Sequence, residues 1–323
     1  MTPSRMWRPK IPGRGANFSR ARAIGETVAR LVYRDGWAAR AWGRLPGRTE
    51  VDVIRHELAI LPVWAPSSRG PAGAPSTESD LGAPARPPLR IAFASDLHIG
   101  PLTAPQLLDR AFSHLAALAP DVLVLGGDYV YMEATHAMAR ELEERVAAVP
   151  ARVKVAILGN HDLWTHHDRI EAALGRAGAR LLINDAIRLP PPHDDVALVG
   201  LDDVWAGQAD PARALAAAEG AALKLGVAHS PEAVPLLAAG GLRLLLCGHT
   251  HGGQIALPTG PVVVQGRHGR RFPAGRFQLD DMTLFVSRGL GQVELPIRAY
   301  ARPDVSLFTL TTPPARPPGS PRP

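Results

Sequence analysis

Short apolar runs alternate with amphipathic stretches through the middle of the chain, and most runs stop at a glycine or a polar residue. Continuous apolar runs of about four to eight residues are typical of strands buried on both faces. We expect such strands at residues 90–95, 122–125, 153–158, 196–201, 223–228, 242–247, 261–264, 283–286 and 305–310. Helical periodicity predicts helices at residues 104–118, 132–148 and 210–218, the first capped by Thr103. This alternation favours an α/β architecture whose sheets are covered by helices.

Four segments of differing composition divide the chain after its N-terminal arm. Residues 49–61 contain the stretch VDVIRHELAI, which predicts a strand that joins the main body. Residues 62–88 are dominated by Pro, Gly, Ala and Ser, which predicts a linker or insertion. We expect the main domain at residues 89–311 and a disordered, Pro-rich tail at residues 312–323.

Charge is distributed unevenly along the 323 residues. Residues 1–48 hold 11 Lys/Arg and 2 Asp/Glu, a net charge of +9, so the rest of the chain carries a net charge of −3. A basic arm on an acidic body points to an anionic surface as partner, and it makes nucleic-acid binding by the body unlikely. The single Cys247 excludes a disulfide within the chain and a cysteine-based zinc site.

The basic arm, residues 1–48, has the pattern of an amphipathic helix. One side of the projected helix carries Ile24, Val28, Leu31, Ala38 and Trp42. Such a helix either lies in a membrane interface or packs on the protein's own core with a solvated basic face, and the sequence leaves both interpretations open. No secretory signal or run of about 20 apolar residues is evident, so we expect a cytoplasmic protein that can bind peripherally at the inner face of the membrane.

Polar side chains that bind metals follow five of the apolar runs. In chain order these residues are Asp96, His98, Asp128, Asn160, His161, Asp162, His229, His249 and His251. Because ligands bind beyond the carboxyl ends of strands in α/β sheets, we expect these side chains to converge at one edge. Together they offer enough oxygen and imidazole ligands for two divalent cations, and the mixed donor set favours Mn²⁺, with Fe²⁺ or Zn²⁺ as alternatives.

The ordered series DxH, GD, GNHD, H and GHTH resembles that of the calcineurin-like metallophosphoesterases. The segments HSPE, CGHTHGGQ and SRGLG are similar to the YkuE-like branch of bacterial phosphodiesterases. The resemblance covers about 220 residues, from near Arg90 to Leu310. It implies a four-layer α-β-β-α sandwich of two mixed sheets flanked by helices. It also implies hydrolysis of a phosphoester or phosphoanhydride by a hydroxide held between two metal ions.

The same resemblance implies a role for each residue of the series. One metal ion would be held by Asp96, His98, Asp128 and His251. The other would be held by Asp128, Asn160, His229 and His249, so that Asp128 bridges the two and shares the catalytic role with His161. His161 would stabilise or protonate the leaving group, and Asp162 is expected to orient His161 or a metal ligand.

Residues outside the series receive a structural interpretation. Cys247 is expected to be buried and inert, and Arg288 to form a structural salt bridge. Gly289 and Gly291 either allow a loop to approach the site closely or form a plain turn. The remaining histidines are read as surface or loop residues, although His166 and His167 follow the GNHD segment closely enough to contact a substrate. These histidines are His56, His114, His136, His166, His167, His193 and His268.

The sequence indicates the class of reaction more clearly than it indicates the substrate. A basic amphipathic arm suits a lipid-linked substrate, and relatives of this branch include enzymes that cleave UDP-2,3-diacylglucosamine at its pyrophosphate in lipid A synthesis. The alternatives are a general phosphodiesterase or phosphatase, a nuclease, and a non-catalytic metal-binding scaffold. A complete set of site residues argues against the scaffold, and the acidic body argues against the nuclease.

Overall fold

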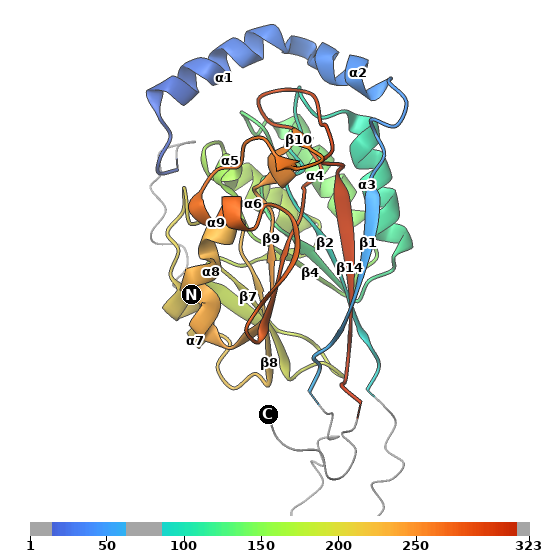
Figure 1. The fold of residues 1–323 in the computed structure, drawn as a ribbon, viewed down its shortest axis with the longest axis vertical. Helices are drawn as coiled ribbons and strands as arrows, with labels where there is room; N and C mark the ends of the chain where they lie inside the picture. Colours follow the sequence, from blue (N-terminus) through green and yellow to red (C-terminus); the bar gives the residue numbers. More distant parts are fainter. Residues whose placement is uncertain (1–14, 63–85, 315–323) are drawn as a thin grey trace, which may run out of the picture.

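Two six-stranded sheets face each other in the computed structural model, which describes residues 15–62 and 86–314 (Figure 1). The first sheet has the order β1-β14-β2-β3-β4-β5, and the second has the order β12-β13-β9-β8-β7-β6. Most of the linker expected at residues 62–88, most of the tail expected at residues 312–323 and the first part of the arm lie outside the described residues.

Both sheets are mixed. In the first sheet β1 is parallel to β14, β14 is antiparallel to β2, and β2 to β5 are parallel. Its strands are β1 Asp52–Ala59, β14 Asp304–Thr311, β2 Leu89–Ala94, β3 Val122–Leu125, β4 Val153–Ala156 and β5 Ala179–Leu181. The second sheet is parallel from β7 to β13 and has antiparallel strands at both edges. Its strands are β12 Gly275–Leu279, β13 Met282–Val286, β9 Leu242–Cys247, β8 Leu223–Val227, β7 Val196–Gly200 and β6 Asp185–Arg188.

The alternation of side chains along the central strands produces the layers. On β2, Ile91 and Phe93 pack into the core between the sheets, while Ala92 and Ala94 face the core under the helices. On β7, Leu198 faces the inter-sheet core and Val199 faces the helices of the second sheet. Successive side chains of a strand point to opposite faces, so apolar residues on both faces bury both sides of each sheet. The four-layer α-β-β-α sandwich is therefore confirmed.

Helices cover the outer faces of the sheets. The described helices are α1 Arg20–Val32, α2 Trp37–Gly43, α3 Pro105–Ala117, α4 His136–Ala147, α5 Asn160–Leu163, α6 His167–Arg176, α7 Pro211–Ala216, α8 Val234–Leu237 and α9 Arg267–Arg271. Of these, α1 and α2 cross one end of the sandwich and do not cover a sheet face (Figure 1). The short 3₁₀ turns are η2 Arg34–Gly36, η4 Pro231–Ala233, η5 Ala238–Gly240 and η6 His251–Gly253, and a small hairpin pairs β10 Ala256–Leu257 with β11 Gly260–Pro261.

Local predictions fail at several element ends. Ala104, not Thr103, precedes α3, because the Thr103 hydroxyl instead accepts a hydrogen bond from the Gln292 amide at 3.1 Å. The helix expected from residue 132 begins at His136, where the Thr135 hydroxyl caps it. The strand expected at residues 261–264 is reduced to the end of β11, because the valines that follow lie exposed beside the site.

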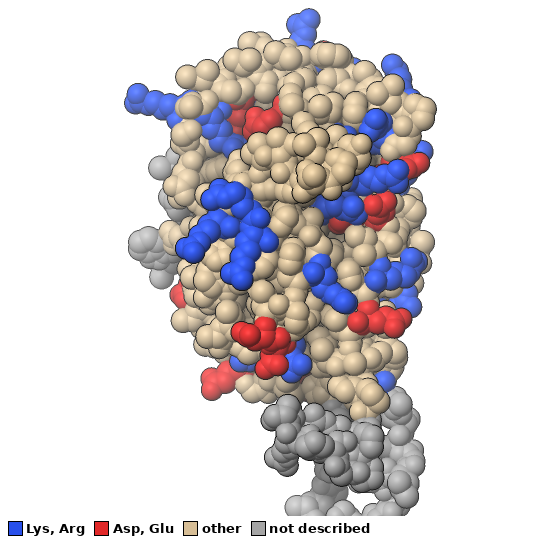
Figure 2. All heavy atoms as spheres, in the orientation of Figure 1, with Lys and Arg blue, Asp and Glu red and all other residues tan. Residues whose placement is uncertain are grey.

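The arm forms an arc over one end of the sandwich (Figure 1). Helix α1 has no buried residue, and Ile24, Val28 and Leu31 are 67%, 52% and 70% exposed. The opposite side of the helix faces the body, where Tyr33 packs near Met132. Since the apolar face points outward, packing of this face on the protein's own core is excluded for α1. Figure 2 shows the outer surface of the arm as mostly uncharged, with basic side chains projecting from it.

Candidate metal centre

Residues at the ends of strands from both sheets meet at the end of the sandwich that the arm crosses. Asp96 and His98 follow β2, Asp128 follows β3, and Asn160 begins α5 after β4. From the second sheet, His229 follows β8, and His249 and His251 follow β9. All of these side chains are buried except that of His249, which is partly buried. The structure therefore brings together every residue of the series that the sequence singled out.

The backbone at these residues is held in an uncommon conformation. Asp96, His98, Asp128, His249 and His251 have φ values of 55°, 44°, 57°, 70° and 54°. Residues other than glycine adopt positive φ rarely, and such strain persists where the surrounding structure enforces it. The turns after β2, β3 and β9 therefore use strained backbone to aim these side chains at one point.

Asp128 lies at the middle of the cluster. Its Oδ1 accepts a hydrogen bond from the His161 amide at 2.8 Å. Its Oδ2 lies 3.1 Å from Nε2 of His229 and 3.6 Å from Nε2 of His98. One carboxylate oxygen thus faces imidazoles from both sheets, which is the position that a bridging ligand requires.

Potential ligand atoms form two groups, one of which contains Asp128. Asp96, His98 and His251 have ligand atoms within 4.8 Å of one another, and so do Asp128, His229 and His249. A further triad joins His98, Asp128 and His161. The first two triads divide the residues as the two expected metal sites do.

The hydrogen bonding of these groups is incomplete without a cation. Nδ1 of His229 lies 2.8 Å from the Gly126 carbonyl and donates to it, so the Nε2 that faces Asp128 needs a proton or a metal ion. Nε2 of His249 and Oδ1 of Asn160 are buried and have no hydrogen-bond partner among the described residues. Buried polar atoms are almost always satisfied, so the donor set fits divalent metal ions.

Burial and neighbouring charges act in opposite directions on the pKa values of Asp128 and His229, whereas burial dominates at His98 and His249. Burial lowers the pKa of His98 to about 4 and that of His249 to about 3, so both imidazoles are neutral at pH 7, as metal ligands must be. Burial alone would raise the pKa of Asp128, but the facing His229 holds it well below its usual range. Burial alone would lower the pKa of His229, but the charge of Asp128 holds it well above its usual range, so His229 and Asp128 form a charged pair beside the neutral imidazoles of His98 and His249.

Asp162 supports the loop that carries Asp128. Its Oδ2 accepts hydrogen bonds from the amides of Asp128 and Gly159 at 2.7 and 3.0 Å, and its Oδ1 accepts one from Tyr129 at 2.8 Å. Through these contacts Asp162 fixes the backbone of the candidate ligand Asp128. None of the three contacts involves the His161 ring. Three backbone donors on one buried carboxylate make this turn rigid.

Three glycines allow the loops to close around the ligands. A Cβ on Gly159 would lie 2.2 Å from Oδ1 of Asp128, and one on Gly289 would lie 2.6 Å from Cβ of Asp96. A Cβ on Gly291 would lie 2.3 Å from the carbonyl oxygen of Leu97. Of the two interpretations left open for Gly289 and Gly291, close approach of a loop to the site is the one that the structure supports.

His161 sits in an aromatic recess beside the cluster. Its ring centroid lies 4.8 Å from that of His98 and 5.3 Å from those of Tyr131 and Trp164. Sequence reasoning missed these aromatic walls. The only signal for Trp164 was its position two residues after the GNHD segment. The packing fixes the imidazole plane toward the cavity.

Trp205 forms a second aromatic wall that sequence reasoning missed. Its indole stacks on His249 with centroids 5.6 Å apart, and its Nε1 donates to the Ser230 hydroxyl at 3.3 Å. The loop that carries it is held by Asp203, whose Oδ1 accepts from the amides of Trp205 and Ala206 at 2.9 and 2.7 Å. The stack with Trp205 therefore fixes the orientation of the His249 ring.

Arg298, to which the sequence analysis assigned no role, supports the site directly. Its side chain is buried and donates to the carbonyls of Arg288 and Ala301 at 2.8 and 3.0 Å and to that of Gly291 at 3.1 Å. Its Nη2 lies 3.0 Å from Nδ1 of His251. Burial lowers the pKa of Arg298 to about 10, which leaves the guanidinium charged at neutral pH.

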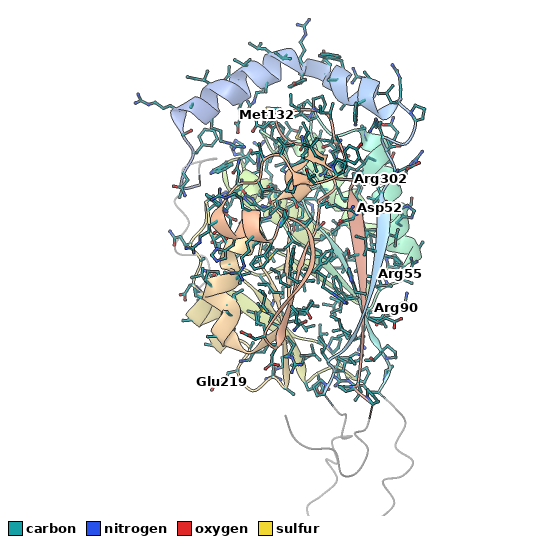
Figure 3. All side chains as sticks on the ribbon, in the orientation of Figure 1. Asp52, Arg55, Arg90, Met132, Glu219 and Arg302 are labelled. Carbon is teal, nitrogen blue, oxygen red and sulfur yellow. The ribbon has the colours of Figure 1, made fainter. Side chains whose placement is uncertain are left out.

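Several residues outside the series lie where the sequence placed them. Cys247 is fully buried, and burial raises the pKa of its thiol. Arg288 pairs with Asp304 and Asp52 at 2.8 and 2.9 Å at the end of the sheet where Asp52 is labelled in Figure 3, so it has a structural role.

His56 departs from the expected surface or loop position, whereas His193 lies in the loop between β6 and β7 as expected, although its side chain is buried. His56 is half-buried in β1 and stacks on Phe308 with centroids 4.5 Å apart. His193 is buried and accepts a hydrogen bond from Nε of Arg86 at 3.0 Å. Neither of them lines the cavity at the metal centre.

A cavity of about 380 Å³ opens above the cluster. Its floor is polar and includes Asp128, Asn160 and His249. Beside the polar side chains of Arg22, Gln254, Gln265 and Glu294, its wall has an apolar part formed by Ile255, Val262, Val263, Val264, Val293 and Leu295. Within the part of the chain that is described, no helix is long and apolar enough to cross a bilayer.

Comparison with known proteins identifies the family of the chain. Residues 89–253 match the model of the calcineurin-like phosphoesterases. Phosphodiesterase YaeI of Escherichia coli is 30% identical over 91% of this chain and 99% of its own length. The uncharacterized metallophosphoesterase YkuE of Bacillus subtilis is 26% identical over 68% of this chain and 78% of its own length. UDP-2,3-diacylglucosamine pyrophosphatase LpxG of Chlamydia trachomatis is 26% identical over 68% of this chain and 83% of its own length.

These similarities confirm the resemblance drawn from the ordered motifs. The matched region begins at β2 and ends in η6, so it includes every strand end that supplies a candidate ligand. The chain belongs to the calcineurin-like phosphoesterase family of metal-dependent phosphoester hydrolases.

Proposed function

We propose that the protein hydrolyses phosphodiester or phosphoanhydride bonds with two divalent metal ions bound on either side of Asp128. The observation that carries this proposal is the position of Oδ2 of Asp128 between His98 and His229, which come from different sheets. Asp96, His98 and His251 would complete one site, and Asn160, His229 and His249 would complete the other. The mixed oxygen and imidazole donors favour Mn²⁺, with Fe²⁺ or Zn²⁺ as alternatives.

When bound, a pair of metal ions supplies Lewis acidity to a phosphoryl group and lowers the pKa of a bound water molecule. The protein supplies the positioning. Asp162 fixes the turn that holds Asp128, and the stack against Trp205 fixes His249. His161 lines the cavity, where it would donate a hydrogen bond or proton to the leaving oxygen.

The cavity suits a substrate with a charged and an apolar part. Phosphoryl oxygens would meet the polar floor, while Val262, Val263 and Leu295 offer an apolar wall to an acyl or other nonpolar group. LpxG is named as a pyrophosphatase of UDP-2,3-diacylglucosamine, a substrate of this kind. We therefore take UDP-2,3-diacylglucosamine, as in lipid A synthesis, as the leading specific substrate. General phosphodiesterase activity, as the name of YaeI states for that relative, is the alternative.

The first test is metal-dependent hydrolysis by the full chain. Purified protein should cleave bis(p-nitrophenyl) phosphate faster than p-nitrophenyl phosphate, lose turnover in EDTA and regain it when Mn²⁺ is added back. Turnover that survives exhaustive chelation would contradict the metal mechanism. Two equivalents of bound Mn²⁺ without turnover on either ester or on UDP-2,3-diacylglucosamine would favour the metal-binding scaffold.

The outer face of the arm suits peripheral binding to a membrane. Ile24, Val28 and Leu31 form an outward apolar stripe, and Arg20 and Arg34 are exposed at the two ends of α1. Such a helix lies in the headgroup region of an anionic bilayer, with its apolar side chains inserted. The protein should sediment with vesicles that contain phosphatidylglycerol, and Leu31→Glu should weaken this binding. Equal sedimentation of the wild type and Leu31→Glu would rule out insertion through this stripe.

A further inference from the structure

The backbone at the start of the described part of the arm forms hydrogen bonds with two loops that border the metal centre. The Gly15 amide donates to the Leu163 carbonyl at 2.8 Å, and the Ala16 amide donates to the Ala206 carbonyl at 3.1 Å. Nε1 of Trp164 donates to the Ala16 carbonyl at 2.9 Å. Leu163 belongs to α5, which carries His161, whereas Ala206 belongs to the loop beside His249. Residues 15–18 therefore tie together two loops on opposite sides of the site.

A second set of contacts holds the C-terminal end of α1 against the body. Nη2 of Arg30 donates to the Met132 carbonyl at 2.8 Å, and Met132 lies directly beneath α1 in Figure 3. Tyr33 packs in the same small cluster as Met132. These contacts set the inward face of α1 on which Arg22, Glu26, Ala29 and Tyr33 lie at helical spacing.

Arg22 is the member of this inward face that enters the cavity. Its side chain is 20% exposed, and its guanidinium carbon lies 4.1 Å from the centre of the Trp164 ring. Its Nη2 lies 3.1 and 3.3 Å from the two ring nitrogens of His161. It lines the cavity together with Asp128 and Asn160.

Among residues 15–62 and 86–314, Arg22 forms an ion pair with Glu26 and with no second carboxylate. Glu26 engages Nε at 3.2 Å and so fixes the guanidinium plane from one edge. The Nη2 edge faces an imidazole and an indole, neither of which is an anion. A guanidinium is planar, always charged, and suited to bidentate contact with phosphate oxygens. Its position beside His161 puts this edge on the side from which the leaving group would depart.

We propose that Arg22 binds a second phosphoryl group on the leaving side of the scissile bond, which makes pyrophosphate-linked compounds the preferred substrate class. This inference rests on the proposed hydrolase function and assigns the N-terminal helix to the substrate site. Water adds to the attacked phosphorus, the bond from that phosphorus to the bridging oxygen breaks, and the electron pair stays on that oxygen. Two phosphate monoesters result, and Arg22 offsets the charge that the leaving monoester gains.

A matched pair of substrates isolates the second phosphoryl group. Bis(p-nitrophenyl) phosphate and P1,P2-bis(p-nitrophenyl) diphosphate carry the same aryl groups and differ by one phosphoryl unit. Charge-assisted hydrogen bonds contribute enough that Arg22→Ala should lower kcat/KM for the diphosphate by about 10- to 100-fold. The same variant also removes the contact with His161, which affects both substrates alike, so the diphosphate-to-diester ratio of kcat/KM should fall by about 10-fold, because the simple diester has no second phosphoryl group for Arg22 to bind.

Two variants and one binding measurement control the experiment. Arg22→Lys should recover part of the loss, since it restores the charge without the planar fork. Arg20→Ala removes an exposed arginine from the same helix and should leave both substrates unaffected. In calorimetry with the Mn²⁺-loaded protein, Arg22→Ala should weaken binding of inorganic pyrophosphate by the same factor of about 10 to 100.

The outcomes of this experiment distinguish a failure of the Arg22 subsite from a failure of the proposed hydrolase function. Equal losses on both substrates would mean that Arg22 only holds the arm in place, and a gain in turnover would mean that it blocks the site. Either result, or an unchanged diphosphate activity, overturns the subsite. If the wild type with Mn²⁺ cleaves neither compound, the proposed function itself fails, whereas cleavage of the simple diester alone rejects only the subsite.

Discussion

Asp128→Ala should abolish hydrolysis and remove most of the bound metal. The carboxylate faces His98 and His229 through one oxygen and accepts the His161 amide through the other. Its loss removes the ligand shared by both sites and also frees the loop that carries His161. Activity should fall by more than the roughly 10²- to 10⁴-fold that removal of a general acid–base group costs. Metal content by plasma mass spectrometry and kcat/KM on the same sample measure both effects.

His161→Ala provides the contrast to Asp128→Ala. Its ring packs between Tyr131 and Trp164 and lines the cavity, and its backbone amide, which holds Asp128, survives the substitution. The variant should therefore retain two metal equivalents while turnover falls by roughly 10²-fold or more. Loss of metal from His161→Ala would show that His161 is a ligand, as the triad with His98 and Asp128 allows, and the assigned roles would be wrong.

The candidate site was predictable because its chemistry follows short, buried strands. Asp96, Asp128 and His249 each lie within a few residues of an apolar run that the sequence marks clearly. The carboxyl ends of neighbouring parallel strands meet at one edge of a sheet, so order along the chain translates into proximity in space. The core strands were equally clear, since Ile91 and Leu198 belong to runs that are apolar on both faces.

Other parts of the site depend on contacts that periodicity cannot encode. Arg22 reaches His161 across 139 positions of sequence, and Arg298 reaches His251 across 47. The edge strands β5 and β6 are short and carry polar residues, so their pattern is no stronger than that of a loop. A lone arginine in a sequence with many arginines gives no signal until the fold places it.

The arm shows a second limit of pattern analysis. Periodicity indicated correctly that Ile24, Val28 and Leu31 share one side of a helix, but it does not state which way that side points. Here Arg22 faces the body, because its guanidinium contacts the rings of Trp164 and His161, and the ion pair within the helix keeps Glu26 beside it. The direction of the helix follows from tertiary contacts of its polar residues, which reverse the usual rule that an apolar face turns inward.

Arg298→Met should destabilise the protein by about 3–5 kcal/mol, because several buried carbonyls lose their hydrogen-bond donor at once. Methionine fills a similar volume but donates no hydrogen bond, so the buried carbonyls of Arg288, Gly291 and Ala301 lose their donor. Each buried acceptor left unpaired costs about 1–3 kcal/mol, and partial relaxation of the loop keeps the total below the sum. Urea unfolding should show a lower midpoint with an unchanged slope.

Arg302→Met is the matched control for this prediction. Arg302 lies four residues away, its side chain is 63% exposed, and it pairs with Glu50 and Asp52 at 3.4 and 3.8 Å near the surface (Figure 3). Exposed ion pairs contribute about 0–1 kcal/mol, so this variant should unfold close to the wild-type midpoint. Because Arg298 also contacts His251, only its variant should lose metal affinity. Equal destabilisation of the two variants would show that the buried guanidinium does not hold the loop against the metal centre.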